Sequence, residues 1–148
     1  MFKPTKILAP TDMSPHSDKA VRQAIEIARQ FGAELFLLHV IQNPVQQCTV
    51  DFCIDANLVT KLQDEMFDAA RKGIQHQAEK YPEAKEITIT TDVKTGTPHD
   101  RILQEEVERG IDLIVISSLG TTGMAKYLMG SVARHVLLGA KCSVLLVK

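Results

Sequence analysis

A stretch rich in glycine and hydroxyl side chains near the end of the chain has the composition of a phosphate-binding loop. The run Ser-Ser-Leu-Gly-Thr-Thr-Gly spans 117–123, and Gly130 and Ser131 follow at the expected start of a helix. Glycines let backbone amides approach an anion, and a helix N-terminus adds unpaired amides and partial positive charge. Ser131 is suited to cap this helix or to donate to an oxyanion. Composition alone leaves a glycine-rich turn without a ligand equally open.

This stretch differs from the two best-known nucleotide-binding motifs. It lacks the Gly-Lys-Ser/Thr ending of a P-loop, and its glycines do not follow the G-x-G-x-x-G dinucleotide pattern. Any nucleotide site built on it therefore uses different contacts.

A carboxylate follows the first apolar run of the chain, in the sequence Pro10-Thr11-Asp12. A carboxylate at this place is suited to accept hydrogen bonds from ribose hydroxyls or to act as an indirect metal ligand. The alternative is a turn-forming Asp whose side chain binds nearby backbone amides. The residue by itself favours the turn.

The sequence shows no arrangement of histidines, lysines or arginines that is typical of a fast catalytic site. The five histidines do not have the spacing of a catalytic triad or a metal site. We expect His39, in an apolar run, to be a satisfied core histidine, and His135 to lie one helical turn beyond the phosphate loop. Lys126 and Arg134 are expected to be solvated helix residues. Because rapid phosphoryl transfer needs a positioned metal and a cationic clamp, we expect binding, with slow hydrolysis at most.

Composition excludes several classes of protein. The chain has 148 residues, 17 basic and 18 acidic side chains, and 45% hydrophobic residues, which are values of a single folded domain over 1–148. The balanced charge gives no sign of nucleic-acid binding. The apolar runs have the length of strands, too short for a membrane span, and the first is too short for a signal peptide.

The three cysteines suggest a reducing compartment. An odd number excludes a complete set of disulfides within the chain. We expect Cys48, Cys53 and Cys142 to be reduced thiols in a cytoplasmic protein. A metal half-site at Cys48 and Cys53 has no second pair of ligands at a suitable spacing.

Strand-like and helix-like segments alternate along the whole chain. Helix boundaries are marked by Ser14-Pro15 and Gly32, and by Thr97-Pro98 and Gly110. The residues from 41 to 55 form a connection longer than usual. Expected strands are Ile7–Pro10, Leu35–Val40, a half-buried segment with Ile87, Ile89, Thr91 and Val93, Leu113–Ile116 and Ser143–Val147.

Two of the expected helices have predicted apolar faces that the structure can test. A long helix should run from about Ala56 to about Tyr81, and the last helix from about Ser131 to Leu138. The stripe of the long helix consists of Leu62, Met66, Ala69, Ala70, Gly73 and Ile74. In the helix that begins after Thr97, the residues expected to face inward are Ile102, Leu103 and Val107.

The βαβαβαβαβ order predicts an α/β fold with a mostly parallel sheet and right-handed crossovers. In such open sheets a ligand binds beyond the carboxyl ends of the strands, where the strand order reverses. The two unusual loops, after the first and fourth strands, lie at these ends.

These residues resemble the universal stress protein family. The similarity covers about 6–148 and includes ILAPTDMSPHSDKAVRQAIEIA, LFLLHV and SSLGTTGMAKYLMGSVARHVLLGAKCSVLLVK. Nucleotide-binding members carry G-x2-G-x9-G-S/T in the last block. Here the counterpart is Ser117-x2-Gly120-x9-Gly130-Ser131, with the spacing intact and Ser117 in place of the first glycine.

The resemblance implies an open five-stranded parallel sheet in the order 3-2-1-4-5, with helices on both faces. It also implies that ATP, with Mg²⁺, binds where Asp12 faces the Gly120 loop. Asp12 would hold the ribose beside Ser117, and the Val40 backbone would meet the adenine. The implied site consists of Pro10, Thr11, Asp12, Val40 and Ser117, with Gly120, Gly130, Ser131 and the Val132 amide around the phosphates. Members commonly form homodimers through the last strand, here Ser143–Val147.

Three hypotheses about function follow. The first is an ATP-dependent stress-response switch that changes its dimer or the surface offered to unknown protein partners. The second, motivated by Ser117, is a member that binds no nucleotide and serves as a protein-interaction module. The third is a nucleotide-cleaving enzyme of a related α/β superfamily, which would need a catalytic signature that this sequence lacks.

Overall fold

The computed structural model describes residues 1–42, 55–119 and 128–148. Within these ranges five parallel strands form one sheet in the order β3-β2-β1-β4-β5, which confirms the expected fold. The strands are β1 (Lys6–Pro10), β2 (Glu34–Ile41), β3 (Ile89–Thr95), β4 (Leu113–Ser117) and β5 (Ser143–Val147). The helices are α1 (Pro15–Phe31), α3 (Ala56–Glu79), α4 (Pro98–Arg109) and α5 (Ser131–Gly139), with a short 3-10 helix η1 (Pro82–Glu86).

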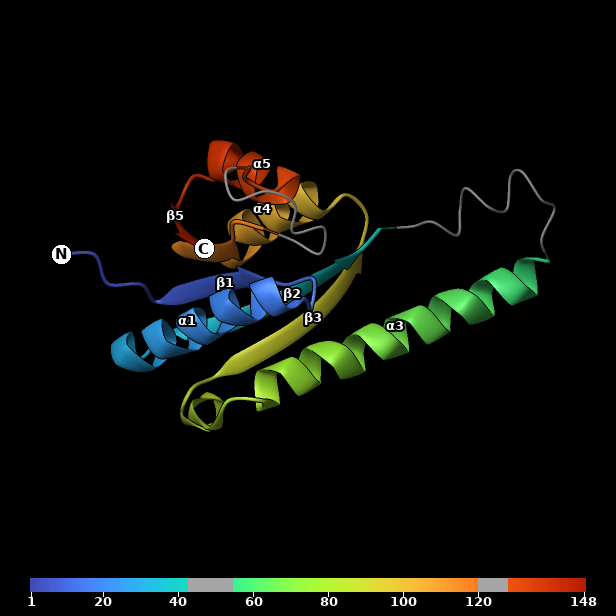
Figure 1. Ribbon diagram of the computed structural model, residues 1–148, viewed down its shortest axis with the longest axis horizontal. Helices are drawn as coiled ribbons and strands as arrows, with labels where there is room; N and C mark the ends of the chain where they lie inside the picture. The colour runs from blue at the N-terminus through green and yellow to red at the C-terminus, as the bar shows by residue number, and fades with distance from the viewer. Residues whose placement is uncertain (43–54, 120–127) are drawn as a thin grey trace.

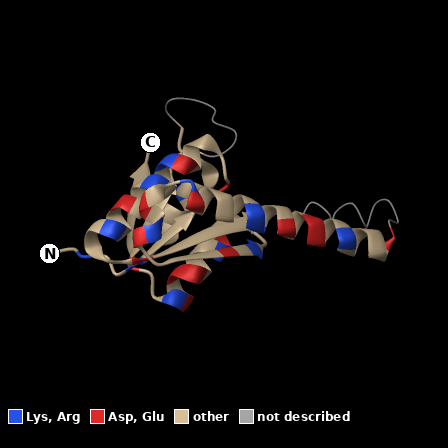
Figure 2. Cartoon of the chain, turned by 90° about the horizontal axis from the view of Figure 1, so that it is seen from below, with Lys and Arg blue, Asp and Glu red and all other residues tan. Residues whose placement is uncertain are grey.

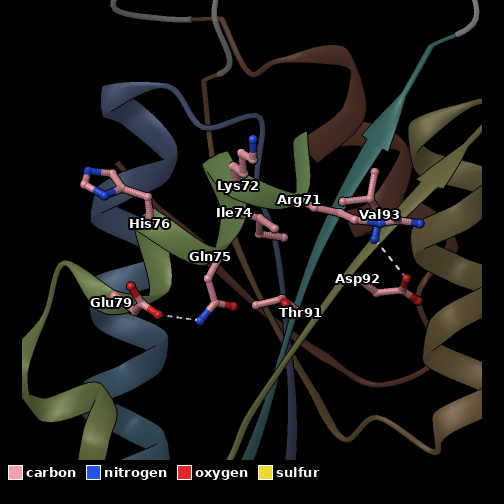
Figure 3. Close-up of a pocket in the computed structure, with 9 residues that line it drawn as sticks. All are labelled: Arg71, Lys72, Ile74, Gln75, His76, Glu79, Thr91, Asp92 and Val93. Atoms are coloured by element: carbon pink, nitrogen blue, oxygen red, sulfur yellow. Dashed lines mark hydrogen bonds between the residues drawn. The ribbon is translucent and has the colours of Figure 1, made fainter. Parts of the chain in front are cut away.

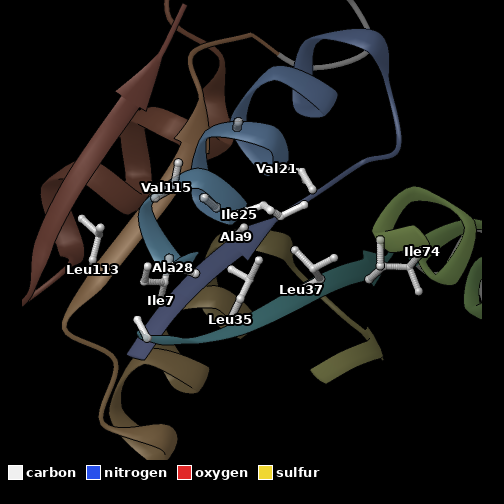
Figure 4. Close-up of a cluster of buried hydrophobic side chains, with 14 residues drawn as sticks. Ile7, Ala9, Val21, Ile25, Ala28, Leu35, Leu37, Ile74, Leu113 and Val115 are labelled. Atoms are coloured by element: carbon white, nitrogen blue, oxygen red, sulfur yellow. The ribbon is translucent and has the colours of Figure 1, made fainter. Parts of the chain in front are cut away.

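The helices lie on both faces of the sheet (Figure 1). Alternate residues of each central strand point to opposite faces, so the sheet divides the core into two clusters. Figure 4 shows one cluster, in which α1 supplies Val21, Ile25 and Ala28 and α3 supplies Ile74. On the other face α4 and α5 cover Leu8, Leu38 and Ile114. The fully buried central strands explain their continuous apolar sequences.

The predicted caps place the helices next to the strand ends. Ser14 accepts a hydrogen bond of 3.3 Å from the amide of Ser17, and Pro15 begins α1. Gly32 and Gly110 end α1 and α4 with φ of +67° and +64°, a left-handed conformation that favours glycine. Thr97 occupies the N-cap position of α4, but its hydroxyl makes no capping hydrogen bond.

The predicted inner face of α4 is wrong at one position. Val107 is 62% exposed, whereas Glu105 and Glu106 are buried. The carboxylate of Glu105 is paired with Lys94 of β3 and with Arg109. Glu106 accepts hydrogen bonds from the amides of Lys141 and Cys142, at 2.7 and 2.6 Å. Because these partners offset the cost of desolvation, the two carboxylates are buried in place of a valine.

The apolar stripe of α3 is covered over only part of its length. Its buried residues, Ala70, Ile74, Gln77 and Ala78, all belong to the C-terminal half, whereas Leu62 is 40% exposed. Figure 1 shows the N-terminal half extending beyond the sheet, and Figure 2 shows both acidic and basic residues along it. The prediction that Leu62 and Ala69 face the core is therefore wrong.

No helix among the described residues is both long and apolar enough to cross a bilayer.

Candidate functional site

All predicted site residues that the structure describes line one pocket of about 490 Å³. The pocket lies beyond the carboxyl ends of β1, β2 and β4, at the reversal of strand order, and its volume is in the range of ligand sites. Gly120 lies outside the described residues. The predicted residues in the pocket are Pro10, Thr11, Asp12, Val40, Ser117, Gly130, Ser131 and Val132.

Asp12 lies in a tight turn between β1 and α1. The amide of Thr11 donates to the carbonyl of Leu38 at 2.8 Å, which extends the pairing of β1 with β2 up to the turn. The Oδ1 atom of Asp12 accepts a hydrogen bond of 2.9 Å from the amide of Ser14. The turn-forming role is thus present. It is compatible with a second role, because an ionised carboxylate has about four acceptor positions.

The N-terminus of α5 forms the other side of the pocket. The amide of Arg134 donates to the carbonyl of Gly130 and begins the helical ladder, so the amides of Ser131, Val132 and Ala133 have no partner within the helix. The first turn carries no acidic residue that would repel an anion. The amide of Gly130, which lines the pocket, donates to the carbonyl of Ser118 at 2.7 Å.

Ser117 uses its hydroxyl within its own loop. The Oγ atom donates to the carbonyl of Leu119 at 2.7 Å and accepts from the amide of Leu119 at 3.3 Å. This serine closes a turn at the end of β4, where the resembling nucleotide-binding motif has a glycine. It remains on the pocket wall.

His39 is a pocket residue that the sequence did not indicate. Its Nδ1 lies 2.8 Å from the carbonyl of Thr11, and since a carbonyl only accepts, Nδ1 carries the proton of this bond. The expected hydrogen-bonded histidine is confirmed, but the ring is half-buried at the pocket wall instead of fully within the core. Its position at the end of β2, next to Val40, was the available signal.

His135 lies close to the pocket without being among its lining residues. Its Nδ1 is 2.7 Å from the carbonyl of Ser131, and its ring stacks on His99 with 4.3 Å between centroids. Across 1–42, 55–119 and 128–148, no group of three or more potential metal-ligating side chains is suitably placed for a metal ion.

A second hollow of about 520 Å³ lies between α3 and the edge strand β3 (Figure 3). Two of its polar side chains have local partners: Gln75 donates to Glu79 at 2.6 Å, and Asp92 accepts from the amide of Val93 at 2.9 Å. Lys72 and His76 point in different directions in Figure 3. Since the basic side chains do not converge, the pocket at the strand ends is the better candidate for an anionic ligand.

Comparisons with known proteins agree with the fold. A family model described as the universal stress protein family matches residues 3–148. Universal stress protein MJ0531 from Methanocaldococcus jannaschii is 33% identical over 97% of this chain and 81% of its own length. Universal stress protein YxiE from Bacillus subtilis is 30% identical over 97% of this chain and 98% of its own length.

Solved structures share the same architecture. Protein MJ0577 from Methanocaldococcus jannaschii has a TM-score of 0.82 at 24% identity, covering 97% of this chain and 95% of that chain. A universal stress protein in complex with cAMP has a TM-score of 0.66 at 22% identity, covering 99% and 98%. One from Archaeoglobus fulgidus in complex with dAMP has a TM-score of 0.57 at 19% identity, covering 99% and 98%. At these identities the likeness shows the fold.

Proposed function

The chain belongs to the universal stress protein family, and we propose that it binds ATP with Mg²⁺ in the pocket at the carboxyl ends of β1, β2 and β4. The observation that carries this proposal is the convergence of Asp12 with the N-terminus of α5 across one pocket. A carboxylate suits ribose hydroxyls, and the unpaired amides of a helix N-terminus suit phosphates. Two relatives in the family have structures in complex with the adenine nucleotides cAMP and dAMP.

Each part of the nucleotide is proposed to contact a particular group of the pocket. Asp12 accepts from the ribose, and the backbone of Val40, near Pro10 and Thr11, meets the adenine edge. The amides of Ser131 and Val132 hold the phosphates above Gly130, and Ser117 lies on the ribose side. Mg²⁺, when bound, neutralises phosphate charge, and it is held mainly through the nucleotide because the described residues supply no dedicated cluster.

We propose binding as the activity, with hydrolysis slow. The described residues that line the pocket include no lysine or arginine to act as a cationic clamp on a transferring phosphoryl group. Phosphate release under excess Mg-ATP measures this point. Sustained turnover that Asp12→Ala abolishes would favour the enzyme hypothesis.

The binding proposal is tested on protein purified from cells. The protein is denatured, the released small molecules are separated by anion exchange, and Mg-ATP is titrated into refolded or nucleotide-free protein by calorimetry. We expect an adenine nucleotide in the supernatant or saturable binding up to millimolar Mg-ATP. Absence of both would contradict the proposal.

The alternative, a protein-interaction module without nucleotide, is favoured by one observation. Ser117 closes its own turn with its hydroxyl and departs from the family motif at a position on the pocket wall. If Ser117→Gly confers ATP binding that the wild type lacks, the alternative holds. If both proteins bind equally, the departure has no functional consequence.

The proposed switch forms a homodimer through β5, and nucleotide binding changes this dimer or the surface that it offers to protein partners. We place the protein in the cytoplasm. The exposed edge of β5 supports the dimer, and the odd number of cysteines supports the reducing compartment. Sedimentation tests the dimer, and fractionation of the source cells tests the location.

A further inference from the structure

Gln77 is a buried amide in the apolar face of α3, and it lies outside the residues that line the nucleotide pocket. The side chain is only 4% exposed and has Ile74 and Ala78 as neighbours on the same buried face. An amide in such surroundings is destabilising unless both its oxygen and its nitrogen are hydrogen-bonded. In this structure both atoms of the Gln77 amide are hydrogen-bonded, which indicates that a polar side chain is needed at this position.

The two hydrogen bonds of Gln77 lead in opposite directions. Its Nε2 donates to Oδ1 of Asp18 at 2.7 Å, and its Oε1 accepts from the hydroxyl of Thr11 at 2.7 Å. The carboxylate of Asp18 also accepts from Lys80 at 2.6 Å. Burial opposes ionisation, but the bonds from Lys80 and Gln77 outweigh it and lower the pKa of Asp18. Since an ionised carboxylate only accepts, the amide is fixed with its oxygen toward Thr11.

The hydroxyl of Thr11, which donates to Gln77, also holds the backbone of the Asp12 turn. It accepts a hydrogen bond of 3.0 Å from the amide of Met13. Met13 has φ of +62°, a left-handed conformation that is costly for a residue other than glycine and persists only where its surroundings hold it. The next amide, that of Ser14, donates to the Asp12 carboxylate at 2.9 Å. The orientation of Asp12 thus follows from the turn that Thr11 holds.

A second contact from α3 reaches the same turn. A Cβ atom on Gly73 would lie 2.5 Å from Sδ of Met13, so the glycine leaves the space that the Met13 side chain occupies. Gly73 and Gln77 are separated by one helical turn and therefore share a face of α3. The C-terminal half of α3 holds the Asp12 turn through one packing contact and one hydrogen bond.

We propose that Gln77 is a positioning residue of the nucleotide pocket, which holds the Asp12 turn through Thr11 and so links the docking of α3 to nucleotide binding. This inference rests on the proposed function. Because linkage is reciprocal, a nucleotide held by Asp12 stabilises the docked position of α3 by the same factor by which the docked helix raises nucleotide affinity.

The test compares Gln77→Met with Gln75→Met. Methionine keeps the length and helix propensity of glutamine but cannot make the two hydrogen bonds. Gln75 is exposed on the same helix and pairs with Glu79, which makes it a matched control. Hydrogen exchange of the Met13 and Ser14 amides is measured without nucleotide, and ATP affinity by calorimetry.

We expect Gln77→Met to raise exchange at both amides and to weaken ATP binding by about tenfold, the scale of one lost hydrogen bond. Gln75→Met should leave both quantities within about twofold. Gln77→Leu removes the same two hydrogen bonds with a shorter side chain, and it should raise exchange in the same way even where Gln77→Met folds poorly. Thr11→Val also removes the acceptor of the Met13 amide, so it gives the exchange expected when the turn is fully released. Unchanged exchange in both Gln77 variants would overturn the inference.

A double-mutant cycle separates positioning from general destabilisation. If Gln77 acts through Asp12, adding Gln77→Met to Asp12→Ala should weaken ATP binding by less than about twofold. A full tenfold further loss would mean that Gln77 acts by another route, and the inference would fail. Lack of ATP binding by the wild type would instead refute the proposed function, and the exchange measurement, which uses no nucleotide, decides the coupling on its own.

Discussion

Gly130 is the residue at which the proposed site depends most directly on the absence of a side chain. Its φ and ψ of −59° and 149° are open to any residue, and the hydrogen bond that its backbone N–H donates to the carbonyl of Ser118 does not require glycine. Gly130→Val should therefore keep the fold but place methyl groups in the proposed phosphate site. We expect ATP affinity to fall by more than about tenfold in calorimetry, with the melting temperature nearly unchanged.

Gly130→Ala serves as the graded control, and its loss of affinity should lie between those of the wild type and the valine variant. Retained ATP affinity in Gly130→Val would show that the phosphates bind elsewhere in the pocket.

Cys142 is a thiol whose reactivity the structure makes unusually low. Burial and the neighbouring Glu106 carboxylate raise the pKa of Cys142 to about 12. Since the thiolate is the nucleophile, we expect this thiol to react with a disulfide reagent at pH 8 about a hundredfold more slowly than free cysteine, after allowing for its greater nucleophilicity. The rate is measured in a Cys48→Ser, Cys53→Ser background.

Glu106→Gln removes the negative charge and keeps an oxygen for the amides of Lys141 and Cys142. It should lower the pKa of Cys142 and speed the reaction. A wild-type rate equal to that of free cysteine would contradict the prediction.

At this scale the sequence indicated residues whose chemistry is unusual for their position, and it missed those that tertiary packing recruits. Asp12 and Ser131 belong to loops with distinctive composition and were predicted for the site. His39 and Gln77 were not. His39 lies in an apolar strand, where its place beside Val40 was the one signal, and Gln77 lies in an apolar helical face. The contacts of both with Thr11 come from tertiary packing.

The elements themselves were predicted well where local signals end them. Ser14, Pro98 and Gly110 act within one turn of the backbone, and the helices begin and end at or near the expected residues. The inner face of α4 was less predictable. Hydrophobic periodicity predicts that Val107, and not Glu105, faces the core. It cannot indicate that Lys94 of β3 pairs with Glu105.

Glu105 provides the prediction that belongs to the element scale, because it fastens α4 to β3. Burial raises the pKa of Glu105, but the hydrogen bonds from Lys94 and Arg109 outweigh it, so the pKa lies below its ordinary value of 4.5. A carboxyl group with a lowered pKa in the folded state stabilises the fold above its unfolded pKa and loses this effect as the pH falls through the folded value.

Glu105→Gln should therefore lower the free energy of unfolding by about 2 kcal/mol at pH 7, as expected for lost hydrogen bonds to charged groups. The difference from the wild type should shrink below about pH 4.5 in urea unfolding curves. Glu108→Gln removes an exposed carboxylate 3.8 Å from the same Lys94 and should change stability by less than about 0.5 kcal/mol. A difference that does not depend on pH would contradict the assignment.

For the whole molecule, the alternation of elements was enough to predict a parallel α/β sheet, and the family resemblance supplied its strand order. The extension of α3 beyond the sheet was not predictable in this way. Its apolar stripe continues through Leu62 and Met66, but the helix extends beyond the sheet on which it packs. The hydrophobic pattern of the helix does not indicate where this packing ends.

The two edges of the sheet differ in a way that bears on assembly. In β3 the sequence alternates, and Thr90 is exposed between half-buried neighbours. In β5 four consecutive apolar residues follow Ser143, and each is only partly buried although it packs on one of the two core clusters. An apolar edge strand of this kind favours pairing with another strand. The proposed dimer would therefore use β5 and leave β3 free.

Sedimentation equilibrium should give twice the chain mass of 16.4 kDa for the wild type. Leu145→Lys introduces a charge on the β5 edge, where a lysine discourages strand pairing, and should give a monomer with a native circular dichroism spectrum. Thr90→Lys places the same charge on the opposite edge and should remain dimeric. A dimer that persists in Leu145→Lys but dissociates in Thr90→Lys would assign the interface to β3. In that case the proposed nucleotide pocket would communicate with the partner through β2 and α3 instead of β4 and α5, since β3 pairs with β2 and β5 pairs with β4.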